Sequence, residues 1–388
     1  MASTERIASC GTADSSRDDR VRVVVTGGGG FVGSHAVERF SRRSADVLAV
    51  DSFARWETLG EHPLGPKVKR YNWERIGALR NVTRLEADVR DARAMDDAMR
   101  GADVIVHTAG QVAVTTSMVD PRTDFNTNVV GTFNVLEAAR KTASDPAIVF
   151  CSTNKVYGDH VNEIPVQEGS TRYSFANPAF RAGIPETFET DRCHHTPYGA
   201  SKLAADLYAQ EYARSYGLKA GVFRMSCIYG TRQFGMEDQG WVAHFAISAA
   251  LGRPLTIFGD GKQVRDVLFV EDLLDAYDAF LVRASDLKGG VFNTGGGPGF
   301  TMSLLELLAL LEKDLRRPIP VSYADWRPAD QKVYVSDIRR ARKELGWTPK
   351  VSPQEGVGRI VEWLRAEPLI RSAAPAAESE SSTPETAK

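Results

Sequence analysis

The chain has 388 residues, of which 43% are hydrophobic and 25% are charged, so it is long enough to bury one large core or two smaller ones. The formal net charge of -2 gives no basic excess, so nucleic acid is not an expected partner. No segment approaches the roughly 18 consecutive apolar residues that a membrane-spanning helix needs, and residues 1–20 lack the apolar core of a signal peptide. We therefore expect a globular cytoplasmic enzyme that has no membrane partner.

The cysteines and histidines do not predict a metal site. The four cysteines are Cys10, Cys151, Cys193 and Cys227. They lie far apart without Cys-x-x-Cys spacing, which argues against both a disulfide framework and a zinc site. His107 at a strand end, and His194 and His195 in a polar loop, are typical of hydrogen-bonded structural histidines. We predict no metal.

The first recognisable unit is a strand, a glycine-rich turn and a helix. Residues 21–26 are a β-branched run that stops at four glycines, and residues 31–42 then have helical spacing. Gly27, Gly30 and Gly33 have no side chains to block a tight turn, the approach of a pyrophosphate to the backbone, or close packing of the helix. The unit therefore predicts a dinucleotide-binding site.

An acidic residue ends the second predicted strand, residues 46–51. Asp51 follows the glycine turn by about 20 residues, where a carboxylate can accept both ribose hydroxyls of an adenosine. This favours NAD over NADP as the cofactor. Arg55 lies close by, and an arginine at that point can instead meet a 2′-phosphate.

A third strand follows an insertion. Residues 54–79 mix charges, prolines and tryptophans without a clean period, so we expect a loop-rich segment there. Residues 82–87 are strand-like and would carry Asp88 and Val89 to the carboxyl end of the sheet, where the ligand crevice of a doubly wound sheet lies. Contact with the adenine is the functional interpretation of these two residues.

The fourth strand, residues 102–107, leads into the turn 108–113. This turn contains Ala109 and Gln111, and its small residues suit the passage of a nicotinamide half. A tight turn without a ligand would have the same composition, and the sequence alone does not separate the two interpretations.

The fifth strand brings hydroxyl groups to the same crevice. A long helix is expected over residues 129–143, just after Asn128, and the strand 147–151 then delivers Ser152 and Thr153 to its carboxyl end. Hydroxyls at that position can hold a substrate alcohol, although a strand-end turn would also use them.

Tyr198 and Lys202 are the strongest candidates for chemistry. They lie four residues apart in a segment that is expected to be helical through about Tyr216, so they share a face. A fixed ammonium beside a phenol stabilises the phenolate and lowers its pKa, which would let Tyr198 take a proton from an alcohol.

Strands and helices alternate as far as about residue 228, which predicts an α/β fold with a doubly wound, Rossmann-type parallel sheet. Turn-rich runs beyond it predict a smaller C-terminal lobe that binds the substrate. The predicted organisation is a disordered leader (1–20), a NAD-binding domain (21–228, with 267–296 returning to the sheet), a substrate lobe (229–266 and 297–367) and a disordered tail (371–388).

These residues together resemble the extended short-chain dehydrogenase/reductase family that modifies nucleotide sugars. The resemblance covers about residues 21–367 and rests on the turn 26–33, Asp51, Asp88, Asn128, Ser152, Thr153, Tyr198 and Lys202, with later signatures at 259–266, 293–295, 327–330 and 345–349. Longer segments resemble the subgroup that inverts C2 of CDP-sugars, namely 109–117, 152–159, 232–241, 261–267 and the polar segment 168–197.

The resemblance implies an epimerase with retained NAD and a nucleotide-sugar substrate, with a CDP-sugar favoured. Thr153, Tyr198 and Lys202 would be catalytic, and Lys202 would also anchor the nicotinamide ribose. The implied cofactor-binding residues are Gly27, Gly30, Phe31, Val32, Asp51, Asp88, Val89, Ala109, Gln111, Asn128, Ser152, Tyr198 and Lys202. The implied substrate-binding residues are Thr115, Thr116, Arg232, Gln233, Arg265 and Arg327, of which Arg265 and Arg327 match arginines that hold the diphosphate. A homodimer or homotetramer would form through the helices that carry Asn128 and Tyr198.

Three other functions share parts of this set. A UDP-sugar 4-epimerase uses the same tyrosine, lysine and hydroxyl residues and differs in base recognition. A 4,6-dehydratase needs an acid and a base just after the threonine, where this chain has Asn154 and Lys155, so we disfavour it. A non-catalytic NAD-binding module would have no need of Thr153, Tyr198 and Lys202 together.

Overall fold

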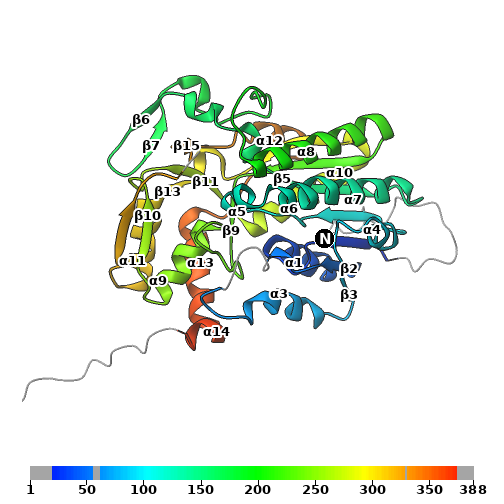
Figure 1. Cartoon of the computed structure of the whole chain (residues 1–388), viewed down its shortest axis with the longest axis horizontal. Helices are drawn as coiled ribbons and strands as arrows, with labels where there is room; N and C mark the ends of the chain where they lie inside the picture. The colour runs from blue at the N-terminus through cyan, green and yellow to red at the C-terminus, as the bar shows by residue number, and fades with distance from the viewer. Residues whose placement is uncertain (1–19, 56–61, 328–329, 374–388) are drawn as a thin grey trace, which may run out of the picture.

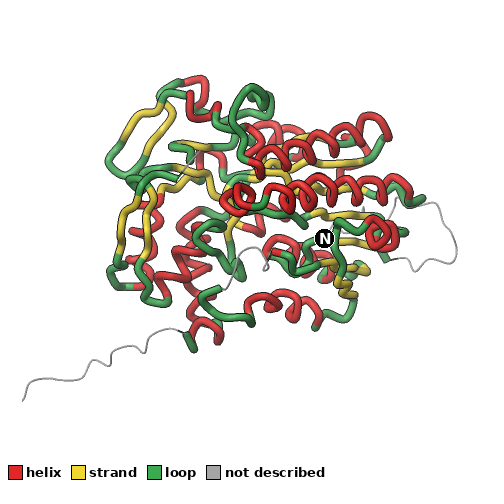
Figure 2. The backbone as a smooth tube through the Cα atoms, viewed as in Figure 1, coloured by secondary structure: helices red, strands yellow, loops and turns green. Residues whose placement is uncertain are grey.

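The computed structural model describes residues 20–55, 62–327 and 330–373, and Figures 1 and 2 show how they are arranged. Of the expected leader only Arg20, and of the expected tail only residues 371–373, fall within these ranges. A seven-stranded parallel sheet has the strand order β12-β8-β5-β4-β1-β2-β3. Its strands are β1 (Arg22–Thr26), β2 (Asp46–Asp51), β3 (Val82–Glu86), β4 (Val104–His107), β5 (Ala147–Thr153), β8 (Lys219–Met225) and β12 (Gly290–Thr294).

The strand order confirms the predicted doubly wound sheet. The chain builds outward from β1 to β3, then crosses back and builds in the other direction from β4 to β12. The direction of winding therefore reverses between β1 and β4. In such sheets the ligand crevice opens at this reversal, outside the carboxyl ends of the strands.

Alternate residues of each strand bury their side chains in two different helical layers. In β1, Val23 and Val25 pack with α1, α3, α10 and α12, whereas Val24 packs with α4, α7 and α8. This period of two explains why the strands are apolar throughout, since both faces of the sheet are covered. The covering helices are α1 (Phe31–Ser41), α3 (Val68–Gly77), α4 (Ala92–Ala98), α7 (Gly131–Lys141), α8 (Pro197–Tyr216), α10 (Val270–Leu287) and α12 (Arg339–Leu345).

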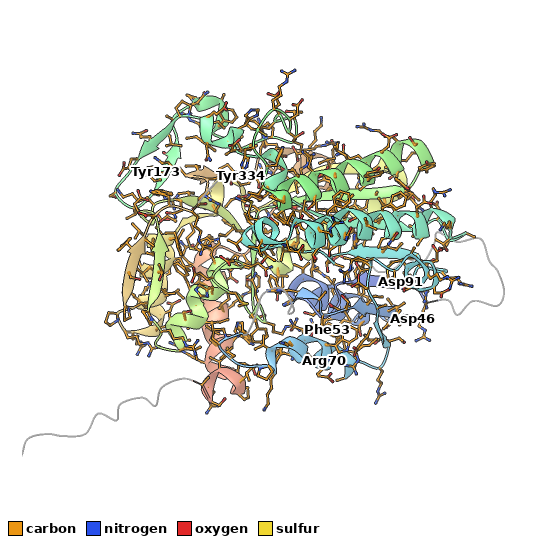
Figure 3. The ribbon with its side chains drawn as sticks, viewed as in Figure 1. Asp46, Phe53, Arg70, Asp91, Tyr173 and Tyr334 are labelled. Atoms are coloured by element: carbon orange, nitrogen blue, oxygen red, sulfur yellow. The ribbon has the colours of Figure 1, made fainter. Side chains whose placement is uncertain are left out.

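Helix α3 corrects the expectation of a loop-rich insertion over residues 54–79. Its buried residues, Val68, Asn72, Trp73 and Ile76, do lie on one face, but charged residues fill the remaining positions and obscure the period. The rings of Phe53 and Trp73 meet edge-to-face, with their centroids 5.3 Å apart. The guanidinium carbon of Arg70 lies over the Phe53 ring, 4.4 Å from its centroid; both residues are labelled in Figure 3. The insertion therefore packs against the loop that follows β2.

The smaller lobe has its own hydrophobic core and its own sheets. Within residues 267–296, which we expected to return to the main sheet, β12 does so by pairing with β8, whereas β11 lies in the second sheet between β13 and β15 and also pairs with β9. The lobe's strands are β9 (Cys227–Tyr229), β10 (Leu255–Phe258), β11 (Val264–Phe269), β13 (Thr301–Ser303), β14 (Val321–Ala324) and β15 (Val333–Tyr334). Its helices are α9 (Trp241–Ala250), α11 (Leu304–Leu315), α13 (Pro353–Ala366) and α14 (Pro368–Arg371).

The segment between β5 and α8 ties this lobe to the main sheet. We call residues 163–195 the interlobe insertion; it contains the hairpin β6 (Val166–Glu168) and β7 (Tyr173–Phe175). Tyr173 donates its backbone N–H to the carbonyl of Lys262 (2.9 Å) and its hydroxyl to Asp260 (2.6 Å). Arg172 forms an ion pair with Glu306 in the lobe. The chain that leads into Tyr198 is thus fastened to the C-terminal lobe.

Candidate active site

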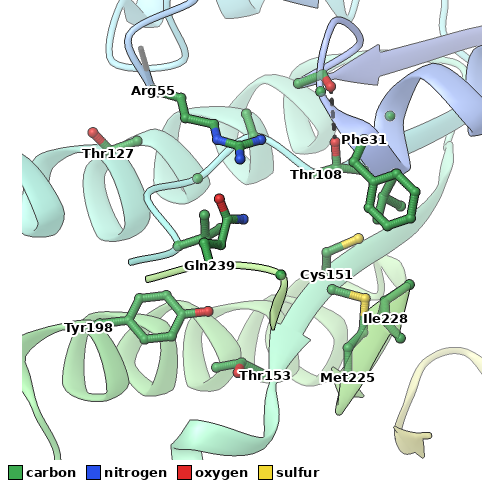
Figure 4. Close-up of a pocket in the computed structure, with 18 of the residues that line it drawn as sticks. Phe31, Arg55, Thr108, Thr127, Cys151, Thr153, Tyr198, Met225, Ile228 and Gln239 are labelled. Atoms are coloured by element: carbon green, nitrogen blue, oxygen red, sulfur yellow. Dashed lines mark hydrogen bonds between the residues drawn. The ribbon is translucent and has the colours of Figure 1, made fainter. Parts of the chain in front are cut away.

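The glycine turn at the end of β1 is held so closely that side chains are excluded. Gly27 has a φ of +72°, and a Cβ atom on Gly33 would lie 2.0 Å from the carbonyl oxygen of Gly27. Thr108, at the end of β4, donates its hydroxyl to the carbonyl of Thr26 at 2.7 Å, which joins the two strand ends where the sheet reverses (Figure 4). The backbone of the turn is therefore bare toward the crevice.

A cavity of about 410 Å³ lies at the carboxyl ends of the central strands (Figure 4). It reaches from the glycine turn to the first residues of the smaller lobe. The predicted site residues that line it are Gly27, Gly30, Phe31, Val32, Asp51, Asp88, Val89, Ala109, Ser152, Thr153, Tyr198 and Gln233. Residues that were predicted from distant stretches of sequence thus share one cavity.

Asp51 is buried at the end of β2. Its carboxylate accepts backbone N–H groups from Gly29 at 2.9 Å and Phe53 at 2.8 Å. Burial raises the pKa of this carboxyl group, and the N–H donors oppose that rise. Arg55 extends into the same cavity (Figure 4), where burial lowers the pKa of its guanidinium to about 10 and the charge of Asp51 counteracts this effect.

Tyr198 lies in the first turn of α8, and the sequence sets that helix start. Pro197 takes the first helical position and the Thr196 side chain accepts the backbone N–H of Gly199, which is a favourable N-terminus. The hydroxyl of Ser117 also accepts the backbone N–H of Tyr198 at 3.1 Å. The Tyr198 phenol is buried on the cavity wall, with its hydroxyl near the side chain of Thr153 at the end of β5 (Figure 4).

The relation between Tyr198 and Lys202 differs from the one expected. Burial raises the pKa of Tyr198 to about 12, and the nearby charge of Asp124 acts in the same direction. The Lys202 ammonium does not contact the phenol; it donates to the carbonyl of Cys151 at 2.6 Å and lies over the ring of Phe150. Burial lowers the Lys202 pKa to about 8. The predicted depression of the Tyr198 pKa by Lys202 is therefore wrong for this arrangement, because desolvation dominates both groups.

Two predicted cofactor residues, Asn128 and Gln111, lie outside the cavity lining and fix the turn after β4. Asn128 accepts the backbone N–H of Gln111 at 2.9 Å and donates to Ser201 at 3.0 Å, so it fixes the turn after β4 to α8. Gln111 folds its side chain onto the backbone of Ala113. Asn128 belongs to a π-helical turn (Asn126–Val130), a feature often found at functional sites.

Ser152 lines the cavity, but its hydroxyl donates to Asp206 at 2.7 Å. Asp206 in turn pairs with Arg224, and both side chains of this ion pair are buried. Both hydroxyl residues at the end of β5 thus meet α8, Thr153 near Tyr198 in its first turn and Ser152 at Asp206 farther along the helix. The hydroxyl of Ser152 is therefore a structural anchor for the end of β5.

The predicted substrate residues divide into two groups. Gln233 lines the cavity, and its Oε1 atom is buried without a hydrogen-bond partner among the described residues. Thr115 and Thr116 lie on the short helix α5 (Val114–Val119), outside the cavity lining, and Thr115 is exposed.

All three predicted arginines form ion pairs with carboxylates of the chain, and two of them, Arg265 and Arg327, do so near the cavity. Arg265 contacts Asp330 at 2.6 Å and the carbonyl of Gln331 at 2.6 Å. Arg327 contacts Glu237 at 2.9 Å, and also Asp238, which lines the cavity. Both lie near the cavity without lining it.

Arg232 is a correction to the substrate assignment. Its guanidinium forms a two-point ion pair with Glu38 of α1, at 2.7 and 3.2 Å, and it lines other hollows than the cavity. Glu38 is nearly buried and also binds Arg75. A buried carboxylate needs such partners, so Arg232 serves the packing of α1.

Sequence reasoning missed the residues that position the site from a distance. They are Ser117, Asp124, Ser201, Asp206 and Arg224. Ser117 and Ser201 belong to stretches that had been singled out for other residues, so their hydroxyls were a weak signal. Asp206 and Arg224 meet only in the folded chain, and nothing local marks them.

The parallel sheet, bare glycine turn, terminal Asp51 and cavity-facing phenol define a dinucleotide-dependent enzyme of the doubly wound class. The model of the NAD dependent epimerase/dehydratase family matches residues 23–295. The chain is 37% identical over 350 residues to the CDP-paratose 2-epimerase of Salmonella typhi, which covers 88% of this chain and 99% of that protein.

Two solved structures are similar along almost their whole length. The UDP-glucose 4-epimerase of Thermotoga maritima with UDP-glucose has a TM-score of 0.71 at 29% identity, covering 89% of this chain and 99% of that chain. The UDP-glucose 4-epimerase of Thermus thermophilus in complex with NAD has a TM-score of 0.70 at 31% identity, with the same coverage. This chain belongs to the NAD-dependent epimerase/dehydratase family, within the extended short-chain dehydrogenases/reductases.

The cavity fits the cofactor of this family, NAD. Gly27, Gly30 and Gly33 line the cavity without side chains, which leaves the backbone of the turn open to a pyrophosphate. The carboxylate of Asp51 lies at the strand end that meets an adenosine ribose. Among residues 20–55, 62–327 and 330–373, no helix has the length and apolarity needed to cross a bilayer.

Proposed function

We propose that this protein is a NAD-dependent CDP-sugar 2-epimerase that interconverts CDP-paratose and CDP-tyvelose through a transient keto-sugar. The observation that carries the epimerase chemistry is the placement of the Tyr198 phenol near Thr153 in the cavity that begins at the glycine turn. The choice of C2 and of cytidine is supported by the 37% identity to the Salmonella typhi enzyme over nearly its full length.

In the proposed reaction Thr153 and Tyr198 hold one sugar hydroxyl between them. Tyr198 takes the hydroxyl proton and later returns it to the same oxygen, so no net redox change occurs. NAD supplies the hydride acceptor in the first half and the hydride donor in the second. The ammonium of Lys202 donates to the Cys151 carbonyl, which keeps a positive charge behind the cavity wall near Tyr198.

The keto-sugar must turn over before its opposite face is reduced, so the sugar has to be held loosely. The fixed point is then the nucleotide diphosphate, for which Arg265 and Arg327 are the candidate ligands. Their present carboxylate partners, Asp330 and Glu237, would have to share or release them. Guanidinium groups suit this role because they bind phosphate oxygens at two points.

Dehydration is disfavoured by the residues next to Thr153. Asn154 and Lys155 both line the cavity. An amide and an ammonium cannot serve as the carboxylic acid and carboxylate that elimination of water would need after the oxidation.

The test is incubation of the purified protein, without added NAD, with CDP-tyvelose, CDP-paratose and UDP-glucose in parallel, followed by NMR of the C2 and C4 stereochemistry. We expect inversion at C2 of both CDP-sugars and none with UDP-glucose. Inversion at C4 of UDP-glucose would replace the proposal with a UDP-sugar 4-epimerase. No reaction with any of the three would contradict the proposed substrate class.

The proposed enzyme pairs with a second copy through the outer faces of α7 and α8. Large apolar side chains are exposed there: Phe133 (40%), Leu207 (52%), Tyr208 (45%) and Tyr216 (57%). Adjacent helical faces of this kind suit an antiparallel helical interface between identical subunits. Leu207→Glu should convert the dimer or tetramer to monomer in light scattering, and an oligomer of unchanged mass would contradict this interface.

A further inference from the structure

Lys155 lines the cavity and Lys202 lies behind its wall, and among the described residues only the Lys202 ammonium has a hydrogen-bond acceptor. Lys202 donates to the Cys151 carbonyl. Lys155, in the short helical turn after β5 (Asn154–Tyr157), lines the cavity, yet within the described part of the chain its ammonium has neither a hydrogen-bond acceptor nor an ion-pair partner. Burial lowers its pKa to about 8. An ammonium that is removed from water raises the free energy of the folded protein unless a ligand in the cavity supplies a hydrogen-bond acceptor.

The charges around Lys155 favour an anion as that ligand. Arg265 lies near enough to lower the pKa of Lys155 further, and Asp330 is the nearby acid that opposes this effect. Asp330 is already bound to Arg265 at 2.6 Å. Lys155 on the cavity wall and Arg265 just outside it are therefore two cations that share one nearby carboxylate, Asp330. A sugar hydroxyl would not balance the remaining positive charge, whereas a phosphate oxygen would.

Lys155 is also fixed close to the reacting hydroxyl. Its backbone N–H donates to the Thr153 hydroxyl oxygen at 3.2 Å, and the Thr153 side chain lies near the Tyr198 phenol in the cavity lining. A phosphate bound by the Lys155 side chain would thus lie beside the point of proton transfer. In a nucleotide sugar the phosphate is attached to C1, which is bonded to C2 and lies across the ring from C4.

We propose that Lys155 binds the sugar-linked phosphate and thereby brings C2, rather than C4, to Thr153 and Tyr198. Lys155 would then determine which carbon is inverted, with Arg265 as the second cation on the same phosphate group. This inference rests on the proposed function as a nucleotide-sugar epimerase.

The experiment compares CDP and CMP binding to the NAD-loaded protein by titration calorimetry, because only CDP carries the second phosphate. Lys155→Met should weaken CDP at least about tenfold, the effect of losing one charge-assisted hydrogen bond, and leave CMP unchanged. Lys155→Arg should retain most of the CDP affinity. The melting temperature of Lys155→Met should not fall, since the substitution removes a partly buried cation that has no partner among the described residues. Lys141→Met, on the outer surface of α7 where Lys141 pairs with Asp96, is the matched control and should leave both affinities unchanged.

Unchanged CDP affinity in Lys155→Met, or an equal loss for CDP and CMP, would overturn the phosphate assignment while leaving the proposed function intact. Failure of the unmodified protein to bind CDP, CMP and UDP would overturn the proposed function and this inference with it. Carbon selection is checked with CDP-tyvelose, which has hydroxyls at both C2 and C4. Lys155→Met should yield C4-inverted product beside the C2 product, and strict inversion at C2 in the variant would contradict the role in carbon selection.

Discussion

The cofactor half and the substrate half of the cavity are built in different ways. In the cofactor half, polar groups are satisfied by backbone atoms a few residues away or on the neighbouring strand: Asp51 binds the N–H groups of Gly29 and Phe53, and Thr108 binds the Thr26 carbonyl. In the substrate half, the arginines are satisfied by carboxylates far away in sequence, as Arg265 is by Asp330.

Ligand binding should therefore depend mainly on backbone geometry in the cofactor half and mainly on charge in the substrate half. The cofactor half is a preformed surface whose geometry follows from strand ends and glycines, so a ligand finds its donors in place. The substrate half is a set of ion pairs, and a ligand with a diphosphate has to compete with carboxylates for the same guanidinium groups. We therefore expect changes in the two halves to have distinct signatures.

The largest effect is expected at Tyr198, where the two halves meet. Tyr198→Phe should reduce turnover roughly 100- to 10,000-fold, the usual contribution of a positioned proton-transfer group, while the content of bound NAD stays the same. Turnover is followed by NMR and NAD by absorbance after denaturation. Tyr208→Phe, at an exposed position of the same helix, is the control and should keep full activity. Full activity of Tyr198→Phe would remove the proton-transfer role.

Next in size is a loss of stability at Arg232. Arg232→Met leaves the nearly buried Glu38 with fewer partners, and breaking such a pair costs about 3 kcal/mol or more in the free energy of unfolding. We expect a lower urea midpoint and unchanged CDP affinity. A variant of normal stability with weakened CDP binding would return Arg232 to the substrate site.

Arg265→Met, in contrast to Arg232→Met, should weaken CDP binding. It removes a candidate phosphate ligand, so CDP affinity should fall by about 1 to 3 kcal/mol, the range for hydrogen bonds to charged groups. Calorimetry with CDP measures this change, and the content of bound NAD serves as the internal control. If CDP binds as tightly as before, Arg265 acts only as the ion-pair partner of Asp330.

The last effect is confined to acidic pH and concerns the cofactor half. His107 is buried between the hydroxyls of Thr26 (2.7 Å) and Thr132 (3.0 Å), and burial lowers its pKa from 6.5 to about 3. Between these values the unfolded chain binds a proton that the folded chain does not. The contribution of the neutral, buried His107 to the free energy of unfolding is therefore complete above about pH 6.5 and is lost as the pH falls toward 3.

His107→Gln should make the loss of stability between pH 6.5 and 4 shallower by about one proton in urea unfolding experiments. The exposed His194→Gln should keep the original slope and serves as the control. Equal slopes for the unmodified protein and His107→Gln would show that His107 becomes protonated in the folded state.

The cofactor half could be predicted from sequence because its geometry is local. A β-branched run, glycines at fixed spacing and an acid at the next strand end specify the turn without knowledge of the rest of the fold. The doubly wound parallel sheet followed from the alternation of strands and helices. Helix α3 was missed because its buried face is interrupted by charges, and β11 was placed with the wrong sheet because its pairing partners lie far along the chain.

The substrate half could not be predicted to the same degree. Nothing near Arg232 indicates that Glu38 will lie beside it in the folded protein. The pKa of Tyr198 depends on burial, which the sequence does not give, so the net shift is opposite to the one expected from Lys202 alone. The resemblance to a family identified which residues to examine, while ion-pair partners and desolvation became visible only in three dimensions.

The interlobe insertion has a consequence for engineering. Residues 163–195 belong to the main domain by connectivity but are hydrogen-bonded to the smaller lobe through Tyr173 and Arg172, and they run directly into the helix of Tyr198. A chimera that receives a foreign C-terminal lobe would keep an insertion shaped for the original one. Grafting a new sugar specificity onto this scaffold therefore requires moving the insertion and the lobe together, as a single transplantable unit.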